Sequence, residues 1–258
     1  MLTIDLAGKT ALVLGGSRGI GAGIVETLCE AGAYTLFTHT GNPKNRERID
    51  TLLERIRGRG GEAKDRAADA VNSADTDGIV KGILDEKGRL DILVCNVGKN
   101  LARTPDAISD EEWREFIDIN LTSGFYGVRA ALKPMERQGY GKIILIASSA
   151  VFDGGGGAVD YAAGKAALTG MMAYLCRAYL KKGIRTNIVH PCVIETDLLK
   201  ERYGDPEKKQ KLLDQIPVGR LGRPEDIAGL TAFLASSWGD YICGQEILAD
   251  GGRTMFNK

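Results

Sequence analysis

TALVLGGSRGIGAGIVETLCEAG, at residues 10–32, predicts a strand, a glycine-rich turn and a helix in direct succession. Residues 10–14 are a short apolar run with β-branched members, which is typical of a buried strand. Residues 20–31 have a helical pattern that ends at Gly32. At such a turn, the backbone N–H groups and the N-terminus of the helix can together bind a phosphate.

The glycines of this turn have the spacing GxxxGxG, which differs from the usual GxGxxG of a dinucleotide-binding turn. The physical requirement is the same, because glycine is needed where a Cβ would block the turn or the pyrophosphate. A tight strand–helix turn without a ligand is the alternative. The density of glycines between Gly15 and Gly23 favours a phosphate-binding loop.

Strand-like runs alternate with helical patterns along the whole chain. The expected strands are residues 10–14, 34–38, 63–68, 90–95, 142–147, 185–189 and 246–249, and the longer expected helices are 20–31, 45–57, 73–87, 121–137, 161–181 and 224–236. This alternation predicts an α/β fold with one doubly wound parallel sheet and helices on both faces, a Rossmann fold. Because no linker or repeat interrupts it, residues 1–258 are expected to form a single NAD(P)-binding domain. The polar, helix-prone segment 197–216 is predicted to be a substrate lid.

The composition is that of an ordinary globular protein, with 43% apolar and 26% charged residues in 258. Lys and Arg together number 34, as do Asp and Glu, so the net charge is zero. Such a chain lacks the bulk electrostatic attraction of nucleic-acid-binding and membrane-surface proteins. No run approaches the ~18 apolar residues of a membrane span. We therefore expect neither nucleic acid nor a membrane as a partner.

The cysteines and histidines are scattered along the sequence. The five cysteines form no CxxC pair, which favours reduced thiols and a cytoplasmic location over a disulfide framework. The N-terminus also lacks the basic and apolar regions of a signal peptide. His39 and His190 lie far apart in the sequence without ligand-like neighbours, so no metal site is expected.

The end of the second expected strand bears on the choice between NAD and NADP. An NAD site usually has an acid here that holds the ribose 2′-hydroxyl, and residues 37–42 (FTHTGN) contain none. Arg18, in the glycine turn, instead offers a positive charge near the expected 2′-phosphate, and His39 and Asn42 lie in the same region. NADP(H) is therefore favoured as the cofactor, and NAD(H) is the alternative. Arg18 could otherwise simply cap a surface turn.

Further candidate contacts follow the third and fourth expected strands. Asp69 could accept a hydrogen bond from an adenine amino group, or it could be a plain turn residue. In a doubly wound sheet the first and fourth strands flank the topological switch point, so residues 15–21 and 96–98 are expected to face each other across one crevice. Lys99 and Arg103 come next, and they either receive an anionic part of the substrate or are solvated surface charges.

The candidate catalytic residues lie within SSAVFDGGGGAVDYAAGK, residues 148–165. Tyr161 and Lys165 are four apart, which places both side chains on one face of a helix. A nearby ammonium lowers the pKa of a phenol, ordinarily ~10, by ~1–3 units, so this pair can exchange a proton with a substrate oxygen near neutral pH. Ser148 follows an expected strand, where its hydroxyl can orient a carbonyl or an alcohol. Alone, the YxxxK spacing is equally typical of an amphipathic surface helix.

Together these motifs resemble the short-chain dehydrogenase/reductase family over nearly the whole chain, and within it the 3-oxoacyl-carrier-protein reductase-like members. The matching pieces are GGSRGIG at 15–21, NVG at 96–98, Asn120, Ser148, the YxxxK at 161–165, Pro191 with Thr196, GRPEDIAGLTAFLASS at 222–237 and GQEILADGG at 244–252. Their order and spacing make the resemblance specific.

The resemblance implies a role for each matched residue. Tyr161 would be the general acid/base, and Lys165 would lower its pKa and bind the nicotinamide ribose. Ser148 would orient the substrate oxygen, and Asn120 would hold a water that links Lys165 to solvent. The residues implied to bind the cofactor, besides Tyr161 and Lys165, are Gly15, Ser17, Arg18, Gly19, Ile20, Asp69, Ala70, Asn96, Gly98, Pro191, Val193 and Thr196; we add His39 for its position.

The resemblance also implies a homotetramer, or a homodimer, in which the helices at 121–137 and 161–181 pair between subunits. Leu14, Val97 and Cys192 depart from the family pattern. The substitutions at Leu14 and Val97 change only the side-chain volume at the base of the expected cofactor site. Cys192 is expected near the nicotinamide, where it would tune cofactor binding or make the enzyme sensitive to thiol reagents.

The leading functional hypothesis is an NADP(H)-dependent oxidoreductase that transfers a hydride between nicotinamide and a small carbonyl compound or secondary alcohol. The first alternative is an NAD-dependent sugar, polyol or hydroxy-acid dehydrogenase on the same fold. The second, from another class, is a non-catalytic dinucleotide sensor. A sensor need not keep Ser148, Tyr161 and Lys165 together, which disfavours that reading.

Overall fold

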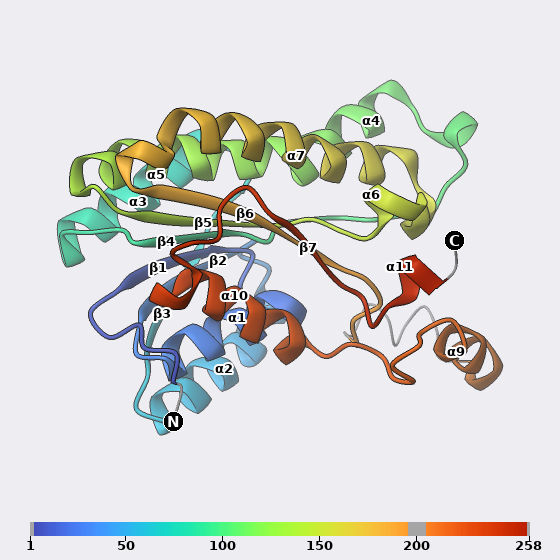
Figure 1. The fold of residues 1–258 in the computed structure, drawn as a ribbon, viewed down its shortest axis with the longest axis horizontal. Coiled ribbons are helices and arrows are strands. Elements are labelled where there is room, and N and C mark those ends of the chain that lie inside the picture. Colours follow the sequence, from blue (N-terminus) through green and yellow to red (C-terminus); the bar gives the residue numbers. More distant parts are fainter. Residues whose placement is uncertain (1–2, 196–204, 257–258) are drawn as a thin grey trace.

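A computed structural model describes residues 3–195 and 205–256, and it shows a parallel sheet between two layers of helices (Figure 1). The strands are β1 (Thr10–Leu14), β2 (Tyr34–His39), β3 (Glu62–Ala67), β4 (Ile92–Cys95), β5 (Gly141–Ile146), β6 (Ile184–Pro191) and β7 (Glu246–Ala249). Their order in the sheet is β3-β2-β1-β4-β5-β6-β7, and every neighbouring pair is parallel. This is the predicted doubly wound α/β sheet.

Helices cover both faces of the sheet (Figure 1). One layer contains α1 (Gly19–Glu30), α2 (Arg46–Gly58) and α10 (Pro224–Ala235), and the other contains α3 (Ser73–Lys87), α5 (Ser123–Gln138) and α7 (Val159–Tyr179). Shorter helices are α4 (Asp110–Ile117), α6 (Ala150–Asp153), α9 (Pro206–Leu213) and α11 (Arg253–Phe256). The short helices α6 and α11 were not expected from the sequence.

Two apolar clusters hold the layers together. One lies between the sheet and α1, α2 and α10, and includes Val13, Leu28 and Phe37. The other lies beneath α3, α5 and α7, and includes Leu93 and Leu168. The central strands are buried on both faces, which is why their sequences are nearly continuous apolar runs.

The edge strand β3 differs from the central strands. Glu62, Lys64 and Arg66 alternate along it and are exposed, whereas the residues between them, Ala63 and Asp65, are partly buried. Because its exposed positions carry charges, this strand lacks the continuous apolar run of the central strands.

The segment expected to form a lid is described only from residue 205 onward, where α9 begins after Asp205. The remainder of 197–216 lies outside the described residues, so the lid remains a prediction. In the described chain, no helix is both long enough and apolar enough to cross a membrane.

Candidate active site

The structure gathers the predicted site residues at the carboxyl ends of the strands. Between β1 and α1 lie Gly15, Ser17 and Arg18, and the first two residues of α1 are Gly19 and Ile20. His39 ends β2, Asp69 and Ala70 follow β3, and Asn96 and Gly98 follow β4. Ser148 follows β5, Pro191 ends β6 and Val193 follows it. Thr196 lies outside the described residues. The carboxyl edge of a doubly wound sheet is where such folds bind their ligands.

The glycine turn has the close backbone packing of a phosphate-binding loop. Gly15 has φ of 80°, in the left-handed region, and a Cβ at Gly21 would collide with the Gly15 carbonyl oxygen. The Gly15 amide donates to Oγ1 of Thr38 at 3.0 Å, which ties the turn to the end of β2. The turn leads into the N-terminus of the 12-residue helix α1, where unpaired N–H groups favour an anion. These features fit the pyrophosphate of a dinucleotide.

The two loops of the switch point meet as expected. β1 pairs with β4, and Nδ2 of Asn96 donates to the Gly15 carbonyl oxygen at 2.7 Å. Asn96 therefore holds the first residue of the glycine turn directly across the crevice.

Three charged or titratable side chains meet beside the end of β2. Nε2 of His39 lies 3.1 Å from Oδ2 of Asp65, and Nη1 of Arg46 donates to the same oxygen at 2.9 Å. Burial alone would raise the pKa of Asp65, yet the hydrogen bonds from Arg46 and His39 outweigh it and lower that pKa. The Asp65 carboxylate beside the end of β2 is therefore already paired with His39 and Arg46. Arg18 is exposed at the start of α1 and has no ion-pair partner within the described ranges.

Asp69 has the geometry of a turn residue. Its Oδ1 accepts from the Val71 amide at 3.0 Å, and its own amide donates to Asp75 at 2.9 Å. Both alternatives raised for Asp69 remain compatible with this geometry, because hydrogen bonds occupy only one of its carboxylate oxygens.

Ser148 and Tyr161 are brought together by the end of β5 and the start of α7. A hydrogen bond between their side chains lowers the pKa of Tyr161, but burial has the larger effect and raises it overall. We expected Lys165 to lower this pKa, but burial raises it overall and Lys165 is not among the groups that act on it. The physical reason is that the Lys165 ammonium is held by other groups.

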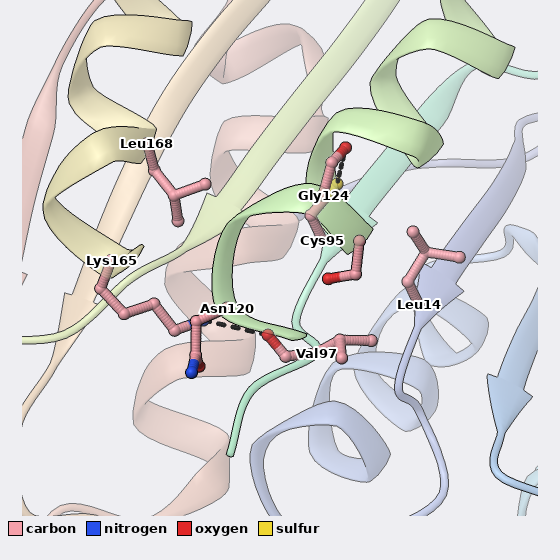
Figure 2. A pocket seen from close by; sticks show the side chains of 8 residues that line it. Leu14, Cys95, Val97, Asn120, Gly124, Lys165 and Leu168 are labelled. Carbon is pink, nitrogen blue, oxygen red and sulfur yellow. Dashed lines mark hydrogen bonds between the residues drawn. The ribbon is translucent and has the colours of Figure 1, made fainter. Parts of the chain in front are cut away.

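Lys165 is 3% exposed, and its Nζ donates to the carbonyl oxygens of Val97 at 3.0 Å and Ile146 at 2.9 Å. Figure 2 shows the side chain reaching from α7 toward Val97. Burial lowers the pKa of Lys165 from 10.5 to about 8. The ammonium therefore joins the loop after β4 to the end of β5. With a pKa of about 8, it begins to lose its proton at a pH just above neutral.

Asn120 lies on a π-helical turn, Asp118–Thr122, between α4 and α5. It is 2% exposed, and its amide holds the Lys99 backbone: Oδ1 accepts from the amide at 3.1 Å and Nδ2 donates to the carbonyl at 2.9 Å. A cavity of about 10 Å³ is lined by Asn120, Lys165, Val97 and apolar neighbours (Figure 2). That is room for roughly one water molecule between polar groups.

Lys99 and Arg103 have different surroundings in the structure. Nζ of Lys99 lies 2.6 Å from Glu115, and both side chains are exposed. The Arg103 guanidinium is buried instead, 2.7 Å from Asp160 and 2.6 Å from Glu112. Lys99 thus forms a surface ion pair and Arg103 a buried one.

Sequence reasoning missed a cation that does reach the site. Nη1 of Arg253, on α11, lies 3.2 Å from Oδ2 of Asp153 and 3.5 Å from Sγ of Cys192, and Nη2 donates to Oε1 of Gln215 at 3.0 Å. Only the tertiary fold brings these segments together, and the one available signal was a basic residue directly after the closing Asp-Gly-Gly. In the described chain, no cluster of three or more His, Cys, Asp or Glu side chains could hold a metal ion.

Comparisons with known proteins agree with the geometry. A family model described as enoyl-(acyl carrier protein) reductase matches residues 15–254. The chain is 36% identical over 252 residues to the 3-oxoacyl-(acyl-carrier-protein) reductase FabG of Vibrio cholerae, covering 98% of this chain and all of that protein. It is 35% identical over 253 residues to an L-rhamnose 1-dehydrogenase (NAD(P)(+)) of Azotobacter vinelandii, covering 98% of both chains.

Solved structures share the fold. A structure from Beutenbergia cavernae, with NADP bound at low occupancy, superposes with a TM-score of 0.90 at 30% identity, covering 98% of this chain and all of that one. The sheet order, the glycine turn and the relatives matched over nearly their whole length support the same assignment. The chain belongs to the short-chain dehydrogenase/reductase family of NAD(P)-dependent oxidoreductases.

Proposed function

We propose that this protein is an NADP(H)-dependent carbonyl reductase and alcohol dehydrogenase in which Tyr161 moves the proton on the substrate oxygen. The observation that carries the proposal is that the Ser148 side chain interacts with the Tyr161 phenol and lowers its pKa, in a site whose next helical turn holds the buried Lys165. A serine beside a tyrosine at the carboxyl edge of the sheet can bind one oxygen from two sides.

Each residue has a distinct part in this mechanism. Ser148 donates to the substrate oxygen and orients it, and Tyr161 gives it a proton in reduction or takes one in oxidation. Lys165 and Asn120 line a small cavity with room for one water. In the proposed mechanism, such a water passes a proton by way of Lys165 to Tyr161 after Tyr161 has protonated the substrate. When bound, the nicotinamide cofactor supplies or accepts the hydride.

NADP(H) is our choice of cofactor because of the charges around the end of β2. Asp65 is bound by His39 and Arg46, which leaves it unable to accept freely from a ribose 2′-hydroxyl. Arg18 is exposed at the glycine turn, where a 2′-phosphate would meet it. The Beutenbergia cavernae structure with NADP supports the same choice.

The test uses two variants and two measurements. Tyr161→Phe should lower kcat by about 10²–10⁴-fold while NADPH binding, followed by fluorescence, stays within twofold. Arg18→Ala should weaken NADPH binding at least tenfold and leave NADH binding unchanged. Full turnover by Tyr161→Phe would remove the catalytic assignment. A preference for NADH that Arg18→Ala does not alter would remove the cofactor assignment.

The similarity to L-rhamnose 1-dehydrogenase favours a second candidate, a sugar or hydroxy-acid dehydrogenase of the same mechanism. A panel of 3-oxoacyl thioesters, sugars, polyols and hydroxy acids, followed by NADPH absorbance, separates the two candidates. Turnover of thioesters alone would exclude the second.

We also propose a homotetramer in the cytoplasm. Phe125 on α5 and Tyr174 on α7 are 45% and 68% exposed, and Trp238 and Tyr241 form a second exposed aromatic group before β7. Exposed apolar groups of this size favour association. Five free cysteines support a reducing compartment. Light scattering and cell fractionation test the two statements.

A further inference from the structure

Arg253 is the starting point, because α11 places its guanidinium against three other segments. It contacts Asp153 at the end of α6, Gln215 after α9, and Cys192 after β6. Figure 1 shows α11 beside the end of the sheet where α6 lies. The side chain is 23% exposed, so it is partly sheltered but reachable.

These contacts tie Arg253 to segments that follow the strand ends of the candidate site. Asp153 lies five residues after Ser148, and Cys192 directly follows Pro191 at the end of β6. Cys192 is close enough to Tyr161 that its charge would raise the pKa of the phenol. Cys192 therefore contacts the Arg253 guanidinium and acts electrostatically on the Tyr161 phenol.

The contact with Cys192 is the weakest of the three. A sulfur is a poor hydrogen-bond acceptor, and this one lies 3.5 Å from Nη1. An oxyanion in place of the sulfur would accept from the same N–H group as a full ion pair, and it is a better acceptor than a thiol. Asp153 and Gln215 would meanwhile keep the guanidinium in position.

We propose that Arg253 is a specificity-determining residue that binds an oxyanion on the substrate, a carboxylate, sulfonate or phosphate close to the carbonyl carbon. The proposal rests on the proposed function, since it assigns a substrate class to the same site. All three cations considered for this role pair with acids, Lys99 with Glu115, Arg103 with Asp160 and Glu112, and Arg253 with Asp153. Arg253 differs from the other two because it also contacts a thiol, that of Cys192. The opposite reading, in which Asp153 and Arg253 together bind hydroxyl groups of a neutral polyol, is an outcome of the test.

The experiment compares matched substrates with the NADPH complex of the full chain. An oxo-carboxylate, its sulfonate and phosphate analogues, and its neutral amide are assayed for kcat/KM. We expect at least one oxyanion to exceed the amide by 30-fold or more, and the order among the three identifies the group. Arg253→Met should remove at least nine-tenths of that advantage and change kcat/KM for the amide by less than threefold.

Arg185→Met is the matched control. Arg185 lies at the opposite end of β6, carries the same charge and has a side-chain exposure of 24%, compared with 23% for Arg253. It should reduce stability without changing the ratio between oxyanion and amide. Equal turnover of the amide and the oxyanions, higher turnover of a neutral polyol, or an equal loss for both substrate types in Arg253→Met would overturn the proposal.

A binding measurement keeps the proposal separate from the proposed function. Malonate, which has no carbonyl to reduce, should bind the NADPH complex in calorimetry, whereas malonamide should not. Arg253→Met should weaken malonate binding at least tenfold, provided its melting temperature and NADPH affinity match those of the wild type. If no carbonyl compound is turned over but malonate still binds through Arg253, the proposed reaction fails and the oxyanion site stands. Malonate binding that is independent of Arg253 overturns the site alone.

Discussion

Nε2 of the fully buried His190 lies 2.9 Å from Oε2 of Glu246, which is partly buried. The other ring nitrogen, Nδ1, donates to the Ser148 carbonyl oxygen at 2.9 Å. Both ring nitrogens thus face oxygen acceptors. This pair joins β5, β6 and β7 at the site.

Replacing His190 should therefore destabilise the protein, whereas a conservative change at Glu246 should be tolerated. His190→Phe removes one hydrogen bond from the Ser148 carbonyl and one from the partly buried Glu246 carboxylate, for an expected loss of about 2–3 kcal/mol in the free energy of unfolding. Glu246→Gln can donate to a neutral imidazole and should lose less than about 1 kcal/mol. Guanidinium unfolding at pH 7 measures both. Equal losses in the two variants would contradict the assigned pairing.

The buried ammonium of Lys165 should make stability depend on pH in a defined direction. Its pKa is about 8 in the folded protein and 10.5 ordinarily, so between these values the unfolded chain binds more protons than the folded one. The destabilisation is complete below pH 8 and is relieved as pH rises toward 10.5. Relative to Lys165→Met, the wild-type free energy of unfolding should therefore rise across this window, by at most about 3 kcal/mol.

Unfolding of both cofactor-free proteins at pH 7, 8, 9 and 10 measures this difference. Subtracting the variant largely cancels the other titrating groups, including the buried cysteines. A difference that is flat or falls with pH would show that Lys165 is not desolvated.

The ion pair between Arg103 and Asp160 should stabilise the start of the catalytic helix. The Asp160 carboxylate is fully buried, accepts from the Tyr161 amide at 2.7 Å and lies 2.7 Å from Arg103. Arg103→Met leaves that charge unpaired, for an expected loss of about 3–5 kcal/mol. The double variant with Asp160→Asn should recover at least half of this loss. Additive losses, measured by thermal and chemical unfolding, would mean that the pair does not interact.

Gly156 should affect Tyr161 directly. It has φ of 83°, and a Cβ there would lie 3.3 Å from Cδ1 of Tyr161. Gly154 has φ of 65° and nothing within 4 Å of its Cβ position, so Gly154→Ala has comparable backbone strain without the contact. Both alanine variants should lose about 1 kcal/mol of stability. Only Gly156→Ala should also lower kcat, by about tenfold; equal kcat values would show that the ring position is not critical.

The sequence was sufficient for the sheet and for the residues that follow its strands. Strand patterns and glycine turns are local, so all seven strands and the meeting of Asn96 with the Gly15 turn could be predicted. Arg253 could not be placed, because its neighbours come from segments 38 to 100 residues away. The direction of the Tyr161 pKa was also missed. Helical spacing places Lys165 on the same face but does not reveal that two carbonyls hold its ammonium.

The charges along β3 have a consequence for how the protein behaves when it is heated or concentrated. An outer strand leaves a row of backbone amides and carbonyls open to pairing with another chain, and exposed charges there discourage such strand addition. Glu62, Lys64 and Arg66 provide this protection on one border of the sheet. Neutralising all three should promote ordered aggregation before the fold itself is lost.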